Sequence, residues 1–422
     1  MKVLEPREMQ RRQDERNKRI KKRGRPLRRV YFIVLVVIIY IATIALSPVP
    51  RISATVTPPK AIQAQPANIV WPADGQAAIG AVGYGLLEQR GEQTPLPTAS
   101  VAKIVTALAV LKAHPIVSGA QPSTITMTQA DEDMYHQYAS EGQSVAPVRA
   151  GQILTEYQAM QAMLLPSANN MAESLSIWAY GSETEYIAFA NTFVKSLGMN
   201  STTIADASGF SPQTVSTATD LVKLAETVMN SAVMTDIVSQ HQADIPLTGS
   251  LHNTNYLLGR SGIIGIKTGN TSEAGGCYLF AAKRSVGGRD LVVVGAVMGA
   301  ANLYQAMSPV PSLIDQTYSN FKESKILSAG QVVGKLNRVG QSGTDVVVKT
   351  ELNTVYWASA PPKYEVIIDD MGDKPVVAGS QVGTIIVASD GQTHKIPLVA
   401  VSSVPVQPLL KRLITVNGRL TL

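Results

Sequence analysis

A basic segment that runs into a long uncharged apolar segment constrains this chain most. Residues 1–30 hold thirteen Lys and Arg against four Asp and Glu, and no charged residue then follows until Arg51. Between them lies V-Y-F-I-V-L-V-V-I-I-Y-I-A-T-I-A-L, from Val30 to Leu46. Seventeen helical residues span roughly 26 Å, and the next four uncharged residues bring the length close to bilayer thickness. We therefore predict a transmembrane anchor over residues 30–50.

A cleaved signal peptide or a buried helix is the alternative explanation of this segment. A signal peptide has a short basic region and an apolar core of about 7–15 residues. Here the basic region is about thirty residues long and no clear A-x-A site follows, which favours an uncleaved anchor. Because positive residues stay on the cytoplasmic side, residues 1–29 are expected to form a cytoplasmic tail. We thus expect a single-pass protein of the cell membrane whose body, after Arg51, lies outside.

The charge outside the tail argues against a nucleic-acid partner. The net charge is +6, but residues 1–30 alone carry +9, so the remaining 392 residues carry −3. A basic surface for nucleic acid is therefore not expected on the main body. The five histidines are scattered and the single cysteine, Cys277, has no cysteine partner for a disulfide. We expect neither a metal site nor a cofactor.

Composition along the chain indicates two folded regions after a juxtamembrane linker. Residues 51–67 are rich in proline and small residues and are typical of a linker. Residues 68–325 have strand-like runs at both ends and helical patterns between them, which predicts an α/β or α+β domain whose sheet joins both ends. The expected helices cover residues 100–113, 154–179, 183–197, 217–231 and 310–322, and the expected strands include 78–87, 277–284 and 290–299.

The residue pattern of the sequence changes near Gly330. Short β-branched runs such as Y-E-V-I-I and V-G-T-I-I-V-A alternate with D-G, S-G and P-P breaks. This pattern predicts a small all-β domain over residues 326–407, about eighty residues long, followed by a tail over 408–422.

The segment T-A-S-V-A-K-I-V-T contains a serine and a lysine at helical spacing. Ser100 and Lys103 are three residues apart, so on a helix their side chains are neighbours. A serine hydroxyl is a weak nucleophile and needs a base, and desolvation among apolar residues lowers the pKa of a lysine. The same spacing recurs at Ser319 and Lys322, where we expect a solvated helix face, so the motif is weak by itself.

Two further segments give the S-x-x-K motif its context. L-L-P-S-A-N-N-M-A places Ser167 and Asn169 after an apolar helix, and G-I-I-G-I-K-T-G-N-T places Lys267 and Thr268 at the end of an apolar strand before Gly269. Each has a structural explanation, a helix N-cap for Ser167 and a strand edge for the second segment. The ordered trio of S-x-x-K, S-x-N and K-T-G is much harder to attribute to structure alone.

This trio resembles that of the penicillin-binding proteins and serine β-lactamases. The chain is most similar to one branch, the D-alanyl-D-alanine carboxypeptidases among the low-molecular-mass penicillin-binding proteins. The similarity extends to L-G-M-N-S-T-T-I-A-D-A-S-G-F, to N-T-N-Y-L-L before the K-T-G motif, and to a C-terminal accessory β domain. It covers roughly residues 68–407 and implies a penicillin-binding transpeptidase-like α/β (α+β) domain.

The resemblance implies a role for each catalytic residue. Ser100 would be the nucleophile that forms an acyl-enzyme, and Lys103 its general base. Ser167 would pass protons toward the leaving amine with the help of Lys267.

The resemblance also implies how the substrate is held. Asn169 would hold the peptide backbone of the substrate, and Lys267 and Thr268 would bind its terminal carboxylate. The oxyanion hole would use the backbone N–H groups of Ser100 and Asn270, and Gly269 of the K-T-G motif would also belong to the substrate-binding residues. Relatives often place an arginine beyond the strand that follows K-T-G, whereas residues 299–309 here contain no Lys or Arg.

The expected substrates are peptidoglycan stem peptides that end in D-Ala-D-Ala, and the expected inhibitors are β-lactam antibiotics. Three alternatives remain at this point: a DD-endopeptidase with the same residues, a β-lactamase-like hydrolase, and a non-catalytic wall-binding protein. A class A β-lactamase needs a glutamate for deacylation, and between Trp178 and Lys223 the only glutamates are Glu183 and Glu185.

Overall fold

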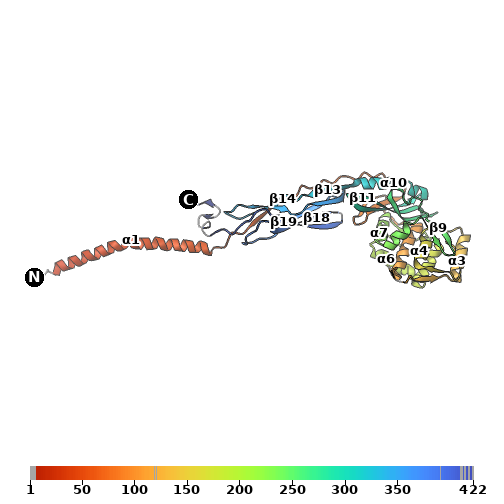
Figure 1. Cartoon of the computed structure of the whole chain (residues 1–422), viewed down its shortest axis with the longest axis horizontal. Helices are drawn as coiled ribbons and strands as arrows, with labels where there is room; N and C mark the ends of the chain where they lie inside the picture. The colour runs from red at the N-terminus through yellow and green to blue at the C-terminus, as the bar shows by residue number, and fades with distance from the viewer. Residues whose placement is uncertain are drawn as a thin grey trace.

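The molecule is elongated, with a long N-terminal helix at one end, a β-rich middle and a helix-rich head at the other end (Figure 1). The computed structural model describes residues 6–408 except 118, 120 and 390, and beyond 408 only residues 412, 415, 416, 419 and 420. Most of the tail expected over 408–422 therefore lies outside the described residues.

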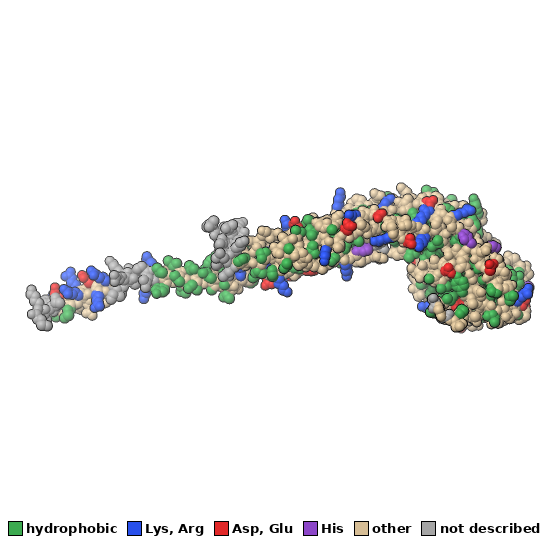
Figure 2. All heavy atoms as spheres, in the orientation of Figure 1, with side chains coloured by type: hydrophobic (Ala, Val, Ile, Leu, Met, Phe, Trp, Pro, Cys, Tyr) green, Lys and Arg blue, Asp and Glu red, His purple; other side chains and the backbone are tan. Residues whose placement is uncertain are grey.

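The N-terminal segment is one continuous helix, α1 (Pro6–Leu46). Its second half, Arg28–Leu46, is 19 residues long with a mean hydropathy of 2.5, and none of it is buried against the rest of the protein. Figure 2 shows charged side chains near its N-terminal end and a continuous hydrophobic surface farther along. By length and composition this half is able to cross a membrane.

The head is built on a five-stranded antiparallel sheet in the order β10-β11-β12-β2-β3. Its strands come from both ends of the region expected to form one α+β domain, as the sequence predicted. Their bounds are β2 (Gln76–Ala81), β3 (Gly85–Arg90), β10 (Ile263–Thr271), β11 (Gly275–Val286) and β12 (Arg289–Ala300).

Helices cover both faces of this sheet because its strands are apolar on both sides. In β11, Tyr278 and Phe280 belong to one hydrophobic core, whereas Leu279 and Ala281 belong to the other, as the twofold alternation of a strand requires. The larger core contains α2 (Lys103–Ala113), α4 (Glu156–Leu164), α5 (Asn169–Tyr180), α6 (Glu183–Ser196), α7 (Ala218–Met229) and α8 (Ala232–Val238). The smaller core contains α9 (Leu303–Met307) and α10 (Val310–Asn320).

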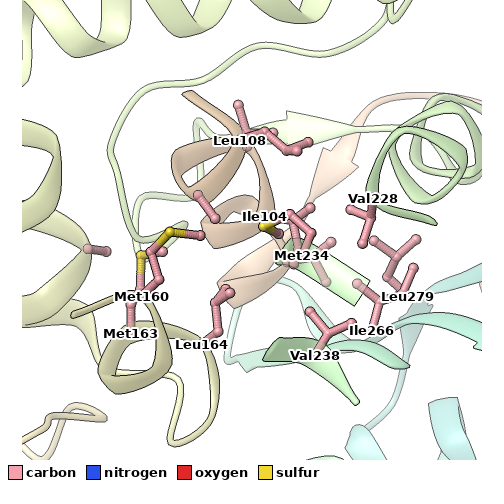
Figure 3. Packing of buried hydrophobic residues seen from close by; sticks show 14 of the residues in the cluster. Ile104, Leu108, Met160, Met163, Leu164, Val228, Met234, Val238, Ile266 and Leu279 are labelled. Atoms are coloured by element: carbon pink, nitrogen blue, oxygen red, sulfur yellow. The ribbon is translucent and has the colours of Figure 1, made fainter. Parts of the chain in front are cut away.

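Helix α2 lies in the middle of the larger core. Ile104 of α2 packs between Met160 and Met163 of α4 on one side and Ile266 and Leu279 of the sheet on the other (Figure 3). All of these side chains are essentially inaccessible to solvent. The start of α2 is therefore fixed by packing against the helix α4 on one side and the sheet on the other.

Helix α10 ends at Asn320, two residues earlier than the sequence predicted. Phe321 begins strand β13 (Phe321–Leu327), which pairs with β16 (Leu352–Trp357). The rings of Phe321 and Trp357 pack edge to face with centroids 5.0 Å apart and anchor this ribbon in the smaller core. Lys322 consequently does not lie on a helix face: its Nζ donates to the backbone carbonyl of Ser319 at 2.9 Å, not to the hydroxyl.

The C-terminal region forms a six-stranded antiparallel sheet in the order β1-β14-β15-β19-β18-β17. The boundary expected between residues 325 and 326 falls inside β13, so the two regions share this ribbon. The strands of the sheet are β1 (Ser53–Val56), β14 (Val332–Asn337), β15 (Thr344–Val348), β17 (Lys363–Ile368), β18 (Gln381–Ser389) and β19 (Gln392–Ala400).

The segment over residues 51–67, expected as a linker, instead contributes to this sheet. Its strand β1 pairs with β14, with Ser53 opposite Asn337. Further along, Gln65 N donates to the carbonyl of Ala358 at 2.9 Å, and Ile62 packs against the core of the β region. The proline-rich composition suits an extended chain, and the distant partner strand makes it an ordered one.

One further helix is α3 (Gln129–Ser140). The other elements are short. They are the 3₁₀ turns η1 (Ala99–Ala102) and η2 (Arg260–Gly262), and the two-stranded pairs β4 (Leu96–Pro97) with β7 (Val215–Ser216), β5 (Thr124–Thr126) with β6 (Ile153–Thr155), β8 (Gln242–Ile245) with β9 (Gly249–His252), and β20 (Thr415–Val416) with β21 (Arg419–Leu420).

Candidate active site

Ser100 lies in the 3₁₀ turn η1, immediately before Lys103 begins α2. Lys103 Nζ is 2.8 Å from Ser100 Oγ, so the pair predicted from the i, i+3 spacing is in contact. Ala99, just before the serine, has a positive φ of 47°. Gly209 packs directly against it, since a Cβ at Gly209 would lie 1.9 Å from the Ala99 carbonyl oxygen. The turn that carries Ser100 is thus held in an unusual backbone conformation by its neighbours.

Lys103 is completely buried and has three polar neighbours. Its Nζ lies 2.6 Å from Asn169 Oδ1 and 3.0 Å from the Ser208 carbonyl oxygen, in addition to Ser100 Oγ. Burial lowers the pKa of Lys103 well below its usual value; the charge of Lys267 lowers it further and that of Asp206 opposes the change. A neutral amine has two N–H donors, which the amide and carbonyl oxygens accept. Its lone pair then faces the Ser100 hydroxyl, the arrangement that a general base requires.

Asn169 is the first residue of α5, and hydrogen bonds hold both the oxygen and the nitrogen of its side-chain amide. Its Nδ2 donates to Gln143 Oε1 at 2.6 Å, which directs Oδ1 toward Lys103. Its backbone N–H donates to the Ser144 carbonyl at 2.7 Å. The amide therefore has a defined orientation beside the serine–lysine pair.

Ser167 is nearly buried and has a positive φ of 67°. The N-cap of α5 is Ala168, and no side chain caps this helix, so capping does not explain the serine. A left-handed backbone is uncommon for a residue other than glycine and is concentrated at functional sites. The loop that presents Ser167 is joined to the third motif region, because Thr254 N donates to the Leu165 carbonyl at 3.0 Å.

Lys267 and Thr268 lie on β10, the edge strand of the five-stranded sheet. Both are buried, and burial lowers the pKa of Lys267 to about 7. Lys267 Nζ donates to the Thr268 carbonyl at 3.0 Å. The Thr268 hydroxyl is 2.7 Å from the hydroxyl of Thr254.

Gly269 lets β10 approach the nucleophile turn closely. A Cβ at this position would lie 2.9 Å from the Thr98 carbonyl oxygen and 3.1 Å from Ser100 N. Only a glycine fits there without displacing the backbone of the turn. The next residue, Asn270, is exposed, so the end of β10 reaches solvent beside Ser100.

A tight turn after α6 completes the surroundings of Lys103. Asp206 Oδ2 accepts from the backbone N–H groups of Ser208 at 3.3 Å and Phe210 at 2.9 Å. Its Oδ1 accepts from Thr214 Oγ1 at 2.5 Å. These bonds present the Ser208 carbonyl to Lys103. A cavity of roughly 260 Å³ lies alongside, and Ser208 and Gln143 are among its lining residues.

The structure brings several of the predicted residues into contact and adds four that received no role from the sequence. Lys103 contacts Ser100 and Asn169, and β10 places Gly269 against Ser100 N, while the Thr268 hydroxyl contacts Thr254. The additional residues are Gln143, Asp206, Ser208 and Thr254. Three of them lie in D-A-S-G and N-T-N-Y, segments that carry the family resemblance, whereas the loop around Gln143 offered no signal.

The site combines a serine paired with a buried lysine, an S-x-N loop and a K-T-G edge strand, between a helical layer and an antiparallel sheet. These features define the class of serine acyl-transfer enzymes that includes the penicillin-binding proteins. Within this class, the family model of D-alanyl-D-alanine carboxypeptidase matches residues 72–302. The chain belongs to the D-alanyl-D-alanine carboxypeptidase family. This confirms the family, the fold class and the serine-type D-Ala-D-Ala carboxypeptidase function predicted from the sequence.

The names of individual relatives agree with this family assignment. The chain is 22% identical over 318 residues to D-alanyl-D-alanine carboxypeptidase DacF of Bacillus subtilis, which covers 73% of this chain and 79% of that protein. It is 28% identical over 190 residues to the D-alanyl-D-alanine endopeptidase of Escherichia coli, covering 43% of this chain and 58% of that protein.

Solved structures agree on the fold. Penicillin binding protein 5 from Haemophilus influenzae matches with a TM-score of 0.57 at 17% identity, over 81% of this chain and 100% of that one. The Streptomyces K15 DD-transpeptidase matches with a TM-score of 0.50 at 26% identity, over 58% of this chain and 96% of that one.

Proposed function

We propose that Ser100 attacks the carbonyl carbon between the two terminal D-alanines of a stem peptide. The hydroxyl proton passes to Lys103 Nζ as the new C–O bond forms, and the C–N bond then breaks. The leaving amine takes a proton and departs as D-alanine, and water later hydrolyses the Ser100 ester. The observation that carries this proposal is the 2.8 Å separation of Ser100 Oγ from a buried lysine amine whose N–H donors are engaged elsewhere.

The other residues take positions that suit this reaction. Ser167 lies on a constrained loop and returns the proton to the leaving amine with the help of Lys267. Asn169, oriented by Gln143, holds the peptide backbone of the substrate. The exposed end of β10 beside Ser100 N supports an oxyanion hole made by the backbone N–H groups of Ser100 and Asn270.

Lys267 and Thr268 bind the terminal carboxylate, and the same residues bind the carboxylate of a β-lactam. At pH near 7 a part of the Lys267 population is charged, because its pKa is about 7. A cation and a hydroxyl next to the acyl centre match a substrate whose anion lies one residue beyond the scissile bond.

Release of D-alanine tests this function directly. The full-length chain in detergent should release D-alanine from N-acyl-Lys-D-Ala-D-Ala, and Ser100→Ala should abolish the release. Equal release by the parent and by Ser100→Ala would contradict the proposal.

A DD-endopeptidase activity is a second candidate, supported by two observations. The E. coli relative at 28% identity is named an endopeptidase, and residues 299–309 supply no cation for a terminal carboxylate. Cross-linked muropeptides distinguish the two functions, since an endopeptidase splits the dimer whereas a carboxypeptidase only shortens its free stem.

The β-lactamase-like alternative receives less support. Burial and the nearby charges of Glu173 and Asp206 raise the pKa of Glu183. Within the described residues, the hydrogen-bond partners of Lys103 are Ser100, Asn169 and Ser208, so no glutamate bonds to this lysine.

We infer that residues 30–50 anchor the protein in the cell membrane, with residues 1–29 in the cytoplasm and the catalytic body outside. The exposed apolar half of α1 and the basic residues before it support this orientation. Protease treatment of intact cells should remove the head and leave a membrane-bound N-terminal fragment. If the intact mass of the membrane-extracted protein corresponded to a chain that begins after Leu46, this result would contradict an uncleaved anchor.

A further inference from the structure

Thr254 places a hydroxyl group directly beside the third motif. Its Oγ1 lies 2.7 Å from Thr268 Oγ1. The side chain of Thr268 is buried, with 4% of its surface exposed, whereas Thr254 is exposed. Thr254 thus forms the solvent side of a hydroxyl pair whose inner member is already a predicted substrate-binding residue.

The two asparagines that flank Thr254 hold this position. Asn253 Nδ2 donates to the Gln240 carbonyl at 2.9 Å, and its Oδ1 accepts from the backbone N–H of Asn255 at 2.9 Å. Asn255 Oδ1 in turn accepts from the Tyr278 hydroxyl at 3.0 Å. Both amides fasten the loop to the protein, so the Thr254 side chain is presented by a fixed backbone.

The backbone of Thr254 is also tied to the second motif. Its N–H donates to the carbonyl of Leu165, two residues before Ser167. One residue therefore contacts the S-x-N loop through its backbone and the K-T-G strand through its side chain. Ser167 and Thr268 are the residues proposed above to meet the leaving amine and the terminal carboxylate, so Thr254 lies beside the expected place of the group on the C-terminal side of the scissile bond.

The chemistry of a hydroxyl pair suits a carboxylate. Each hydroxyl has one donor and two acceptor lone pairs, so in the pair one donor is used and the other is free. When a carboxylate arrives, both hydroxyls can turn toward it and each can donate to one oxygen. Residues 299–309 contribute no Lys or Arg there, so neutral donors carry a larger share of the recognition.

We propose that Thr254 is a substrate-binding residue that shares recognition of the terminal carboxylate with Thr268. The inference rests on the proposed function and adds to it a determinant of specificity for a free C-terminus. It predicts that loss of the Thr254 hydroxyl weakens turnover of free acids more than turnover of C-terminal amides.

The test compares Thr254→Val, which removes the hydroxyl at nearly constant volume, with Thr254→Ser, which retains it. In the full-length chain, Thr254→Val should lower kcat/KM for N-acyl-Lys-D-Ala-D-Ala by roughly 10- to 100-fold, as expected for a lost hydrogen bond to a charged group. The ratio of kcat/KM for the acid to that for its C-terminal amide should fall as well. Thr254→Ser should stay within about threefold of the parent, since a replacement that keeps the donor keeps the bond.

Thr227→Val is the matched control, because Thr227 is a partly exposed threonine on α7 whose hydroxyl donates to the Lys223 carbonyl of the same helix. It should leave both substrates unaffected. An equal loss on acid and amide, or no loss with Thr254→Val, would overturn the proposal.

A binding measurement separates this proposal from the proposed function. If the parent released no D-alanine, the function would fail, but the affinity for N-acetyl-D-Ala-D-Ala could still be measured by calorimetry. Ser100→Ala should bind this peptide, and Ser100→Ala with Thr254→Val should bind it at least tenfold more weakly. Equal affinities of the two variants would refute the role of Thr254.

Discussion

Lys103 Nζ and Asn169 Oδ1 are 2.6 Å apart, so one hydrogen bond joins the S-x-x-K turn to the S-x-N helix. With the Ser208 carbonyl, this amide occupies both donors of a neutral Lys103 amine and leaves its lone pair for Ser100. The value of Lys103 as a base therefore depends on contacts from two distant segments, not on its spacing from the serine alone.

Replacing Lys103 should show that the surroundings of this lysine, and not its spacing from the serine alone, make it the base. In Lys103→Ala, the rate at which a fluorescent penicillin acylates the protein should fall about 10²- to 10⁴-fold or more, because base and nucleophile act as a unit. Lys103→Arg should not restore it, because a guanidinium stays protonated. Lys322→Ala is the control: Lys322 also follows a serine by three residues, yet its Nζ donates to the serine's backbone carbonyl and not to its hydroxyl, so acylation should be unchanged. Parent-like activity of Lys103→Arg would show that the amine is not the base.

The activity should depend on pH through the two buried lysines. Lys103 must be neutral to accept a proton, so acylation should fall as the pH drops through its lowered pKa. Lys267 must be charged to attract a carboxylate, and its pKa is about 7, so KM for the free acid should rise as the pH increases above about 7. Lys267→Arg should remove this alkaline rise. A rise in KM that persists in Lys267→Arg would assign it to another group.

Gly209→Ala should disturb the nucleophile turn, and Gly181→Ala provides a matched control. Both glycines have positive φ, +76° and +84°, so both replacements incur the left-handed penalty of roughly 1–2 kcal/mol. Only at Gly209 would the new Cβ meet the Ala99 carbonyl, at 1.9 Å, whereas nothing lies within 4 Å at Gly181. Gly209→Ala should lose about 1–3 kcal/mol more in thermal unfolding and at least tenfold in acylation rate. Equal effects of the two variants would argue against this contact.

Much of the site could be predicted because its residues lie in short contiguous motifs. The contacts that were missed are made between segments far apart in the sequence. Gln143 meets Asn169 across a loop with no distinctive pattern. The pairing of Ser53 with Asn337, 284 residues away, turns an apparent linker into a strand. Phe321 continues the apolar pattern of α10 but leaves the helix because Trp357 receives its ring.

Glu156→Gln should stabilise the protein in a pH-dependent way. Glu156 is 1% exposed, neither carboxylate oxygen has a partner, and burial raises its pKa to about 7. The protonated form is therefore favoured in the folded state, and stability is lost as the pH rises from about 4.5 through about 7. Glu156→Gln should be more stable by up to about 3 kcal/mol at pH 8 and nearly equal at pH 4.5. Glu185→Gln, at an exposed glutamate, should show no such trend in thermal melts.

The site of covalent attachment of a penicillin tests the central claim most directly. The full-length chain is incubated with benzylpenicillin, digested, and its peptides are mapped by mass spectrometry. We expect the peptide that contains Ser100 to gain the mass of the whole drug, because opening of the lactam ring by the hydroxyl loses no atoms. Ser100→Ala should gain none, while Ser319→Ala, in the second S-x-x-K sequence, should be labelled like the parent. An adduct on any other residue, or no adduct at saturating drug, would contradict the assignment of Ser100 as the nucleophile.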